Sequence, residues 1–119
     1  MAVVGASTNP RRPSCKVTSY LSRHGYRVIP VNPQAQQILG KTSYPDLSSI
    51  PETVEIVDIF RRPDEVMPVV DEAIKIGAKV VWMQEGVVNE AAASKARDAG
   101  LLVVMDKCMR KEHRRLTQK

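Results

Sequence analysis

Residues 54–83, VEIVDIFRRPDEVMPVVDEAIKIGAKVVWM, decide the fold. Two continuous apolar runs, Val54–Phe60 and Lys79–Met83, flank a stretch whose apolar residues recur every three or four positions. Continuous runs rich in Val and Ile are typical of strands buried on both faces, and the 3.6-residue period is typical of an amphipathic helix. We therefore predict a strand, a helix and a second strand. Gly77 ends this helix, and Pro68 makes its first turn irregular or lies close to the start of the regular helix.

The same alternation of predicted strands and helices continues in both directions along the chain. Apolar runs begin about every 25 residues, and the three others are Ala2–Val4, Val28–Val31 and Leu101–Met105. Between them we predict one helix from a Ser14 cap to Gly25 and another from an Asn89 cap to Gly100. Strands and helices that alternate at this spacing build right-handed βαβ units around a parallel sheet. The prediction is one α/β domain over residues 1–119, three-layered and Rossmann-like, with about five parallel strands and helices on both faces.

Residues 33–51 interrupt this alternation. They show no clear helix or strand, and turn-forming pairs occur at Leu39-Gly40 and at Tyr44-Pro45-Asp46. We expect this segment to be an excursion from the sheet.

Length and composition exclude several classes of protein. A chain of 119 residues with 43% hydrophobic and 26% charged residues can bury a core as one domain. It contains no apolar run long enough to span a bilayer and no charged signal-peptide start, so we expect a cytoplasmic protein that does not bind membranes. Two cysteines and two histidines are not grouped as a disulfide framework or a metal site.

The net charge of +5 lies entirely in residues 107–119, because the acidic and basic residues of 1–106 cancel. One interpretation is a surface for nucleic acid or another polyanion. The tail has no aromatic residue and the whole chain has five, too few for a base-stacking surface. We favour a solvated terminal helix and expect nucleic acid not to be the partner.

The loops that follow the five strands carry the candidate site, because ligands of open parallel sheets bind at the carboxyl ends of the strands. The loop after the first strand combines Gly5, small residues, the arginines Arg11 and Arg12 and the start of a helix. Free N–H groups and the positive end of a helix dipole favour a phosphate or a diphosphate. The G-x-G-x-x-G pattern is absent, and no acid follows the second strand at Asn32-Pro33 to bind a ribose 2′-hydroxyl. These observations disfavour NAD and leave NADP or coenzyme A.

Five motifs in order carry a resemblance to a known family. They are GAS-x-NP-x-RPS from Gly5, GY-x-V-x-PVNP from Gly25, D-x-FRRP from Asp58, VW-x-Q-x-GV from Val81 and MD-x-C-x-x-x-EHRRL from Met105. Together they resemble the small stand-alone CoA-binding proteins, which are similar to the N-terminal CoA-binding domain of the succinyl-CoA synthetase alpha subunit. The resemblance covers essentially the whole chain. It implies a Rossmann-like protein that binds coenzyme A or acyl-CoA as a non-catalytic carrier, sensor or regulatory module.

The resemblance also assigns residues to the CoA site. Its diphosphate loop corresponds to Gly5, Ala6, Ser7, Asn9, Pro10, Arg11 and Arg12, and the turn after the second strand to Asn32 and Pro33. Phe60, Arg61, Arg62, Pro63 and Val66 would pack beside the ligand, and Gln84, Glu85 and Gly86 would lie near the CoA arm. Arginines can bind the phosphates of CoA through two hydrogen bonds each.

Other assignments stay open at this point. Cys15, early in a helix, is a candidate for a mixed disulfide with CoA, although a small core residue is the favoured interpretation. Cys108 and His113 suggest a nucleophile and its base, but we favour a role in docking the tail. Asp58, inside a buried strand, needs a partner that the sequence does not identify.

No convincing catalytic set is visible, and the alternatives to CoA binding are an NADP-dependent oxidoreductase and a polyanion-binding tail. Members of the resembling family usually begin with a short helix, whereas Met1 here nearly abuts the first strand. The apolar surface that such a helix would cover favours self-association, so a homodimer or an unknown protein partner is left open.

Overall fold

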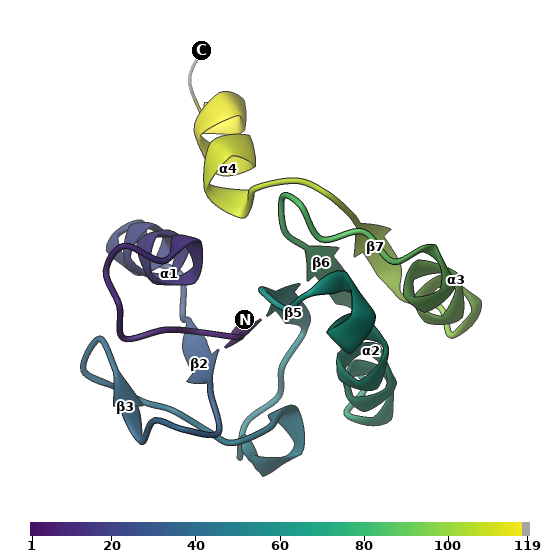
Figure 1. Cartoon of the computed structure of the whole chain (residues 1–119), viewed down its shortest axis with the longest axis horizontal. Helices are drawn as coiled ribbons and strands as arrows, with labels where there is room; N and C mark the ends of the chain where they lie inside the picture. The colour runs from purple at the N-terminus through teal and green to yellow at the C-terminus, as the bar shows by residue number, and fades with distance from the viewer. Residues whose placement is uncertain (118–119) are drawn as a thin grey trace.

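A five-stranded parallel sheet forms the centre of the computed structural model, which describes residues 1–117. The strand order is β2-β1-β5-β6-β7, as Figure 1 shows. The strands are β1 (Ala2–Val4), β2 (Ile29–Val31), β5 (Ile56–Ile59), β6 (Val80–Met83) and β7 (Leu102–Val104). Each lies inside one of the five predicted apolar runs, so the predicted sheet is confirmed.

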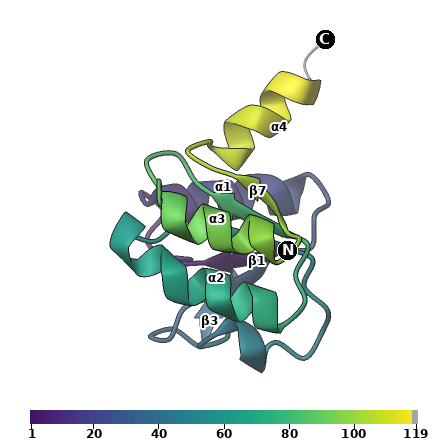
Figure 2. The same cartoon turned by 90° about the vertical axis from the view of Figure 1, so that its right-hand side faces the viewer.

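Helices cover both faces of the sheet and give three layers, as predicted. They are α1 (Pro13–Arg23), α2 (Val66–Lys75), α3 (Glu90–Asp98) and α4 (Met109–Thr117). Figure 2 shows α2 and α3 together in front of the sheet and α1 behind it. α4 starts at the carboxyl edge of the sheet and projects from the body of the molecule (Figures 1 and 2). No helix among residues 1–117 is long and apolar enough to cross a membrane.

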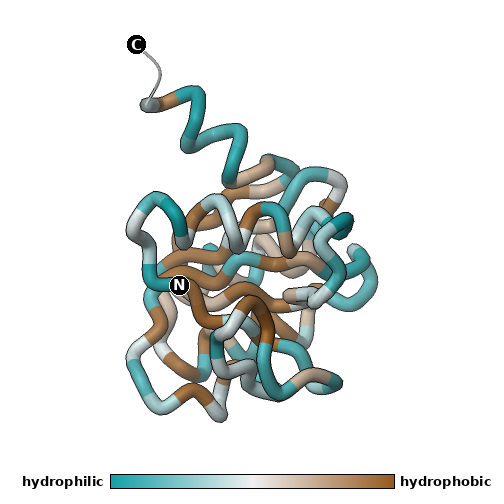
Figure 3. The backbone as a smooth tube through the Cα atoms, turned by 90° about the vertical axis from the view of Figure 1, so that its left-hand side faces the viewer, coloured by the Kyte–Doolittle hydropathy of each residue, from teal (hydrophilic) through white to brown (hydrophobic). Residues whose placement is uncertain are grey.

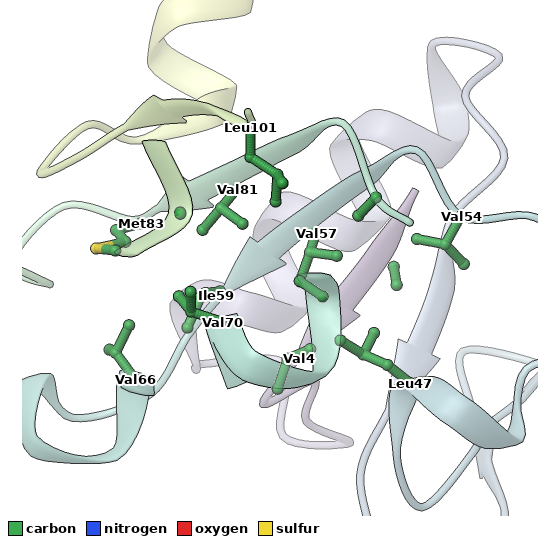
Figure 4. Close-up of a cluster of buried hydrophobic side chains, with 14 of the residues drawn as sticks. Val4, Leu47, Val54, Val57, Ile59, Val66, Val70, Val81, Met83 and Leu101 are labelled. Atoms are coloured by element: carbon green, nitrogen blue, oxygen red, sulfur yellow. The ribbon is translucent and has the colours of Figure 1, made fainter. Parts of the chain in front are cut away.

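Alternate residues of the three central strands, β1, β5 and β6, contribute to two separate apolar clusters. On the α2 and α3 side, Val57 and Ile59 of β5 pack with Val70 of α2 (Figure 4). On the α1 side, Val3 packs with Leu21 of α1. The central strands are therefore mostly apolar, with Asp58 of β5 as an exception, whereas α4 is mostly hydrophilic (Figure 3). Burial on both faces explains why the strands read as continuous apolar runs.

The helix ends agree with the sequence at most positions. Gly25, Gly77 and Gly100 all have positive φ just after a helix, and Asn89 caps α3 by accepting a hydrogen bond from the Ala92 N–H at 2.9 Å. The predicted Ser14 cap is wrong. α1 begins at Pro13 and Ser14 lies buried inside it, because proline with its fixed φ suits the first helical position.

A 3₁₀ turn, η2 (Pro63–Glu65), precedes α2, which puts Pro68 in the third helical position. Of the two predicted alternatives, the structure shows a regular helix that starts close to Pro68, with the irregular turn before it. Proline is tolerated there because the first N–H groups of a helix have no partner within the helix.

Residues 33–51 are more ordered than predicted. They form a small antiparallel hairpin, β3 (Gln37–Ile38) with β4 (Lys41–Thr42), and a 3₁₀ turn, η1 (Leu47–Ser49). The two residues of the hairpin loop, Leu39 and Gly40, have φ of 53° and 72°. Two positive φ values define a type I′ turn, which matches the twist of paired strands. The turn at Leu39-Gly40 was predicted, but the strands on either side of it were not, because each has only two residues and leucine is unusual in a hairpin loop of this type.

Candidate functional site

A cleft of about 540 Å³ lies at the carboxyl edge of the sheet. The strand order places β1 and β5 side by side in its middle, where the chain switches direction across the sheet. Residues from the loops after all five strands and from the first turns of α1 line the cleft. They are Gly5, Ala6, Ser7, Arg12, Pro13, Ser14, Val17, Asn32, Pro33, Gln34, Phe60, Arg61, Gln84, Glu85, Val87 and Cys108.

The loop after β1 is held in place by its neighbours. The Gly5 N–H donates to the Val31 carbonyl at 3.1 Å, and the Asn32 side chain donates from Nδ2 to the Ala6 carbonyl at 2.8 Å. Asn32 Oδ1 also accepts from the Gln34 N–H at 2.8 Å. Asn32 therefore ties the first loop to the turn after β2 and fixes one wall of the cleft.

The N-terminal end of α1 faces the cleft through Pro13 and Ser14. No side chain caps this end, because the cap residue is Arg12, whose side chain has no hydrogen-bond acceptor. The positive end of the helix dipole is thus directed to the cleft without a carboxylate to compensate it. Such an end favours an anionic group of a ligand.

Of the four arginines that the resemblance assigned to the site, two line the cleft. Arg12 and Arg61 both border it, and neither forms an ion pair among residues 1–117. Arg11 is exposed and lies outside the lining. Arg62 also lies outside it and bonds to Asp64 at 3.3 Å and to Glu65 at 2.8 Å. Each Arg-Arg pair therefore supplies one arginine to the cleft.

Ten of the predicted site residues line the cleft and seven do not. Those outside the lining are Asn9, Pro10, Arg11, Arg62, Pro63, Val66 and Gly86. Asn9 shapes the first loop, since its Oδ1 accepts from the Arg11 N–H at 3.0 Å. Val66 is fully buried in the core on the α2 side, as Figure 4 shows, and does not face the cleft. The Gly86 N–H donates to Asp106 Oδ1 at 2.7 Å and joins the turns after β6 and β7.

Gln84 at the floor of the cleft bonds to a buried carboxyl. Its Nε2 donates to Asp58 Oδ1, and its Oε1 accepts from the Met109 N–H at 3.3 Å. Asp58 is fully buried, and its Oδ2 has no partner among the described residues. Burial raises the pKa of the Asp58 carboxyl from 3.8 to about 7, against the lowering effect of the Gln84 hydrogen bond. The partner that the sequence could not identify is thus Gln84, 26 residues further along the chain.

Sequence reasoning missed six of the lining residues. They are Pro13, Ser14, Val17, Gln34, Val87 and Cys108. Proline next to the arginines could have indicated the start of α1, and the position of Cys108 after the fifth strand could have placed it at the cleft. Cys15, the other cysteine, is buried in α1 and does not line the cleft.

Neither histidine lines the cleft. His113 Nδ1 lies 2.8 Å from the Tyr20 hydroxyl, and His24 Nδ1 lies 2.8 Å from the Tyr20 carbonyl oxygen. The bond between Tyr20 and His113 joins α4 to α1, which supports a docking role for the tail, whereas the His24 bond lies at the end of α1 itself. Several basic side chains of the tail are also paired, Lys111 with Glu85 at 3.0 Å and Arg115 with Glu112 at 2.8 Å. Lys119, the last residue of the predicted basic tail, lies outside the described residues.

Comparison with known proteins settles the family. A model of the CoA binding domain matches residues 1–114. The chain belongs to the CoA-binding domain family. One curated relative, the uncharacterized protein YneT of Bacillus subtilis, is 37% identical over 113 residues, covering 95% of this chain and 84% of YneT.

Solved structures similar to this chain share its fold. A hypothetical protein from Pyrococcus horikoshii OT3 is 47% identical with a TM-score of 0.96, over 98% of this chain and 82% of its own. A larger relative is the ADP-forming acetate–CoA ligase II of Archaeoglobus fulgidus, 33% identical over 82 residues. These residues make up 66% of this chain and 12% of the ligase, so the chain is homologous to a small part of that enzyme.

Proposed function

We propose that this protein binds coenzyme A or acyl-CoA in the cleft at the carboxyl edge of the sheet and performs no reaction on its own. Membership of the CoA-binding domain family supports the ligand class. Within the site, the observation that carries the proposal is the meeting of three anion-binding features on one cleft. These are the glycine loop after β1, the uncapped start of α1, and two arginines without carboxylate partners among residues 1–117.

The two ends of the cleft suit the two ends of CoA. In nucleotide-binding sheets of this kind the ribose lies near the end of the second strand, and the phosphates lie at the first loop. By this analogy the adenosine would lie over Asn32, Pro33 and Gln34 and the diphosphate over Gly5 to Ser7. The pantetheine arm would then extend over Gln84, Val87 and Cys108 at the other end.

A role without chemistry is supported by the nature of the groups that line the cleft. Both histidines lie outside the lining and are engaged with Tyr20. Cys108 therefore has no histidine beside it in the cleft to act as its base, which weighs against a Cys–His nucleophile.

Calorimetric titration of the reduced protein tests the proposal. CoA should bind with micromolar affinity, and 3′-dephospho-CoA more weakly if Arg12 or Arg61 meets the 3′-phosphate. Undetectable binding of CoA at millimolar concentration by folded protein would overturn the proposal. Binding of NADPH alone would instead support the oxidoreductase alternative.

The arginines provide matched variants for the same titration. Arg12→Ala and Arg61→Ala should each weaken CoA about tenfold or more, because each removes a charge-assisted hydrogen bond to phosphate. Arg62→Ala is the control, since this arginine is held by Asp64 and Glu65 outside the cleft. Equal losses in all three variants would mean that the arginines act only through the general field of the surface.

A further inference from the structure

The structure places a buried carboxyl, Asp58, directly behind Gln84 at the floor of the cleft. We propose that Asp58 is a positioning residue: it orients the Gln84 carboxamide so that this side chain recognises the amide-bearing arm of the ligand. The inference rests on the proposed function, because it concerns the part of the cleft over which the pantetheine arm would lie. It goes beyond the proposed function in two ways. It assigns a role to Asp58, which does not line the cleft, and it explains how the site would distinguish CoA from a nucleotide that lacks the arm.

Two independent hydrogen bonds fix the orientation of the Gln84 carboxamide. An ionised carboxylate can only accept, so Nε2 of Gln84 must face Asp58. The backbone N–H of Met109 can only donate, so Oε1 must face α4, at 3.3 Å. Both constraints select the same orientation of the amide. A second N–H and a second lone pair remain on Gln84, and these match the C=O and N–H groups of a ligand amide.

The environment of Asp58 argues against a purely structural role. The side chain is fully buried and its Oδ2 has no hydrogen-bond partner among residues 1–117. A carboxyl in this position reduces the stability of the fold compared with an apolar residue of similar size. Its cross-strand neighbours in the register, Val3 and Trp82, show that an apolar side chain is compatible with this side of the sheet. What Asp58 contributes is a fixed acceptor for Gln84.

The same bonds connect the cleft floor with the start of α4. Met109, which donates to Gln84, is buried in the cluster on the α1 side, and Cys108 beside it lines the cleft. A change in the Gln84 orientation would therefore also move the turn between β7 and α4. Two hydrogen bonds thus link Asp58 within β5, Gln84 after β6 and Met109 at the start of α4.

The experiment compares two ligands on wild-type protein and on Asp58→Asn. The ligands are CoA and 3′-phosphoadenosine 5′-diphosphate, which shares the nucleotide but lacks the pantetheine arm. Asparagine keeps the shape of aspartate but can present an N–H to Gln84, so the amide loses its defined orientation. Asp58→Asn should weaken CoA about fivefold or more and leave the affinity of the nucleotide unchanged.

A double-mutant cycle separates positioning from any other effect of Asp58. Gln84→Met should weaken CoA to a similar extent, and adding Asp58→Asn to it should have little further effect. An undiminished effect of Asp58→Asn in the Gln84→Met background would overturn the proposal. Equal losses for CoA and the nucleotide would also overturn it, because the floor would then not distinguish the arm. If wild-type protein binds neither ligand, the proposed function itself fails.

The pH profile supplies a readout that a structural role would not move. The ionisable groups that line the cleft are Arg12, Arg61, Glu85 and Cys108, and none of them forms an ion pair with Asp58. In wild-type protein, the ratio of CoA affinity to nucleotide affinity should fall between pH 8 and pH 6 as Asp58 becomes protonated and its bond to Gln84 weakens. In Asp58→Asn this ratio should be constant. A ratio that falls equally in both proteins would contradict a role of the carboxyl.

Thr18→Val is the matched control for removing a buried polar group. The Thr18 hydroxyl is buried and has no partner among the described residues, but Thr18 does not line the cleft. Its replacement should leave both affinities unchanged. A loss of CoA affinity in this variant as large as that in Asp58→Asn would show that any repacking beneath the cleft affects the ligand, and would overturn the specific role of Asp58.

Discussion

The carbonyl oxygen of Phe60 occupies the space that a side chain on Gly5 would need. A Cβ built on Gly5 would lie 2.0 Å from this oxygen, and Gly5 has φ of 88°. The close neighbour of Gly5 is therefore the residue that follows β5, and the N–H of this residue, Phe60, donates to the Val4 carbonyl at 2.8 Å. Gly5 thus maintains the contact of β1 with β5 beneath the cleft.

Gly5→Ala should therefore destabilise the fold even without a ligand. Backbone atoms cannot rotate away as a side chain would, so the two strand ends must separate. Gly25→Ala is the control, because Gly25 has a similar φ of 87° but nothing within 4 Å of the added Cβ. It should cost only the strain of the left-handed conformation, about 1–2 kcal/mol. Thermal unfolding of both variants checks this, and equal midpoints would contradict the role of Phe60.

Leu39 is a site where the fold can be made more stable. It adopts φ of 53° in the hairpin loop and is 48% exposed, so it has positive-φ strain without compensating burial. Leu39→Asn should raise the free energy of unfolding by about 0.5–1 kcal/mol, since asparagine favours this conformation in type I′ turns. Chemical denaturation measures the change. Leu39→Ala removes the exposed apolar surface but not the strain, and an equal gain in that variant would rule out the backbone explanation.

The stability of the protein should fall as the pH rises from about 4 to 8, through the Asp58 carboxyl. Its pKa is raised from 3.8 to about 7 by burial, so between these values the folded state holds a proton that the unfolded state has released. Protonation of Asp58 therefore adds up to about 4 kcal/mol to the free energy of unfolding at low pH. This contribution is lost as the pH rises through 7.

Urea unfolding at several pH values tests this contribution directly. Asp58→Asn should abolish this part of the pH dependence and be more stable than wild-type protein at pH 8. Parallel stability profiles for the two proteins would mean that Asp58 does not titrate between pH 4 and 8. The opposite directions expected for stability and for CoA affinity in this variant distinguish a positioning role from damage to the fold.

The docking of α4 depends on the contact between Tyr20 and His113. The Tyr20 hydroxyl lies 2.8 Å from His113 Nδ1 in a partly buried position, and the two rings meet edge to face. Tyr20→Phe removes only this bond and should cost about 1 kcal/mol, with faster hydrogen exchange of the α4 amides. Tyr26→Phe is the control, because the Tyr26 ring also packs on His113 but its hydroxyl makes no bond among residues 1–117. Unchanged exchange in Tyr20→Phe would show that α4 is held by its first turn alone.

Much of the architecture could be predicted because it depends on local patterns. The runs around Val57 and Val81 and the period of α2 lead to βαβ units, and in a parallel sheet this fixes the edge at which the loops meet. The loops could thus be identified before any contact was known. The helix ends were predictable where a single residue determines them, as at Asn89, and not at Ser14, where Pro13 next to it determines the start of α1.

The details of the site were less predictable because they depend on contacts between distant residues. Arg61 and Arg62 are equivalent in the sequence, and only the acidic residues around η2 determine which of them stays free. From the sequence alone, Val66 could be either a ligand contact or a core residue. Only the structure shows that it lies on the face of α2 that packs against the sheet. The partner of Asp58 lies 26 residues away, and no local pattern identifies such a pair.

The positions of the two thiols give the protein a built-in attachment point for a reporter group. Cys15 is shielded in α1, whereas Cys108 is partly accessible and borders the cleft. A thiol-reactive fluorophore should therefore label one position without any engineered cysteine, and this position is next to the floor on which a ligand would rest. Ligand binding in the cleft should then change the fluorescence emission of the label. Candidate metabolites can therefore be screened for binding by fluorescence, without a change to the sequence.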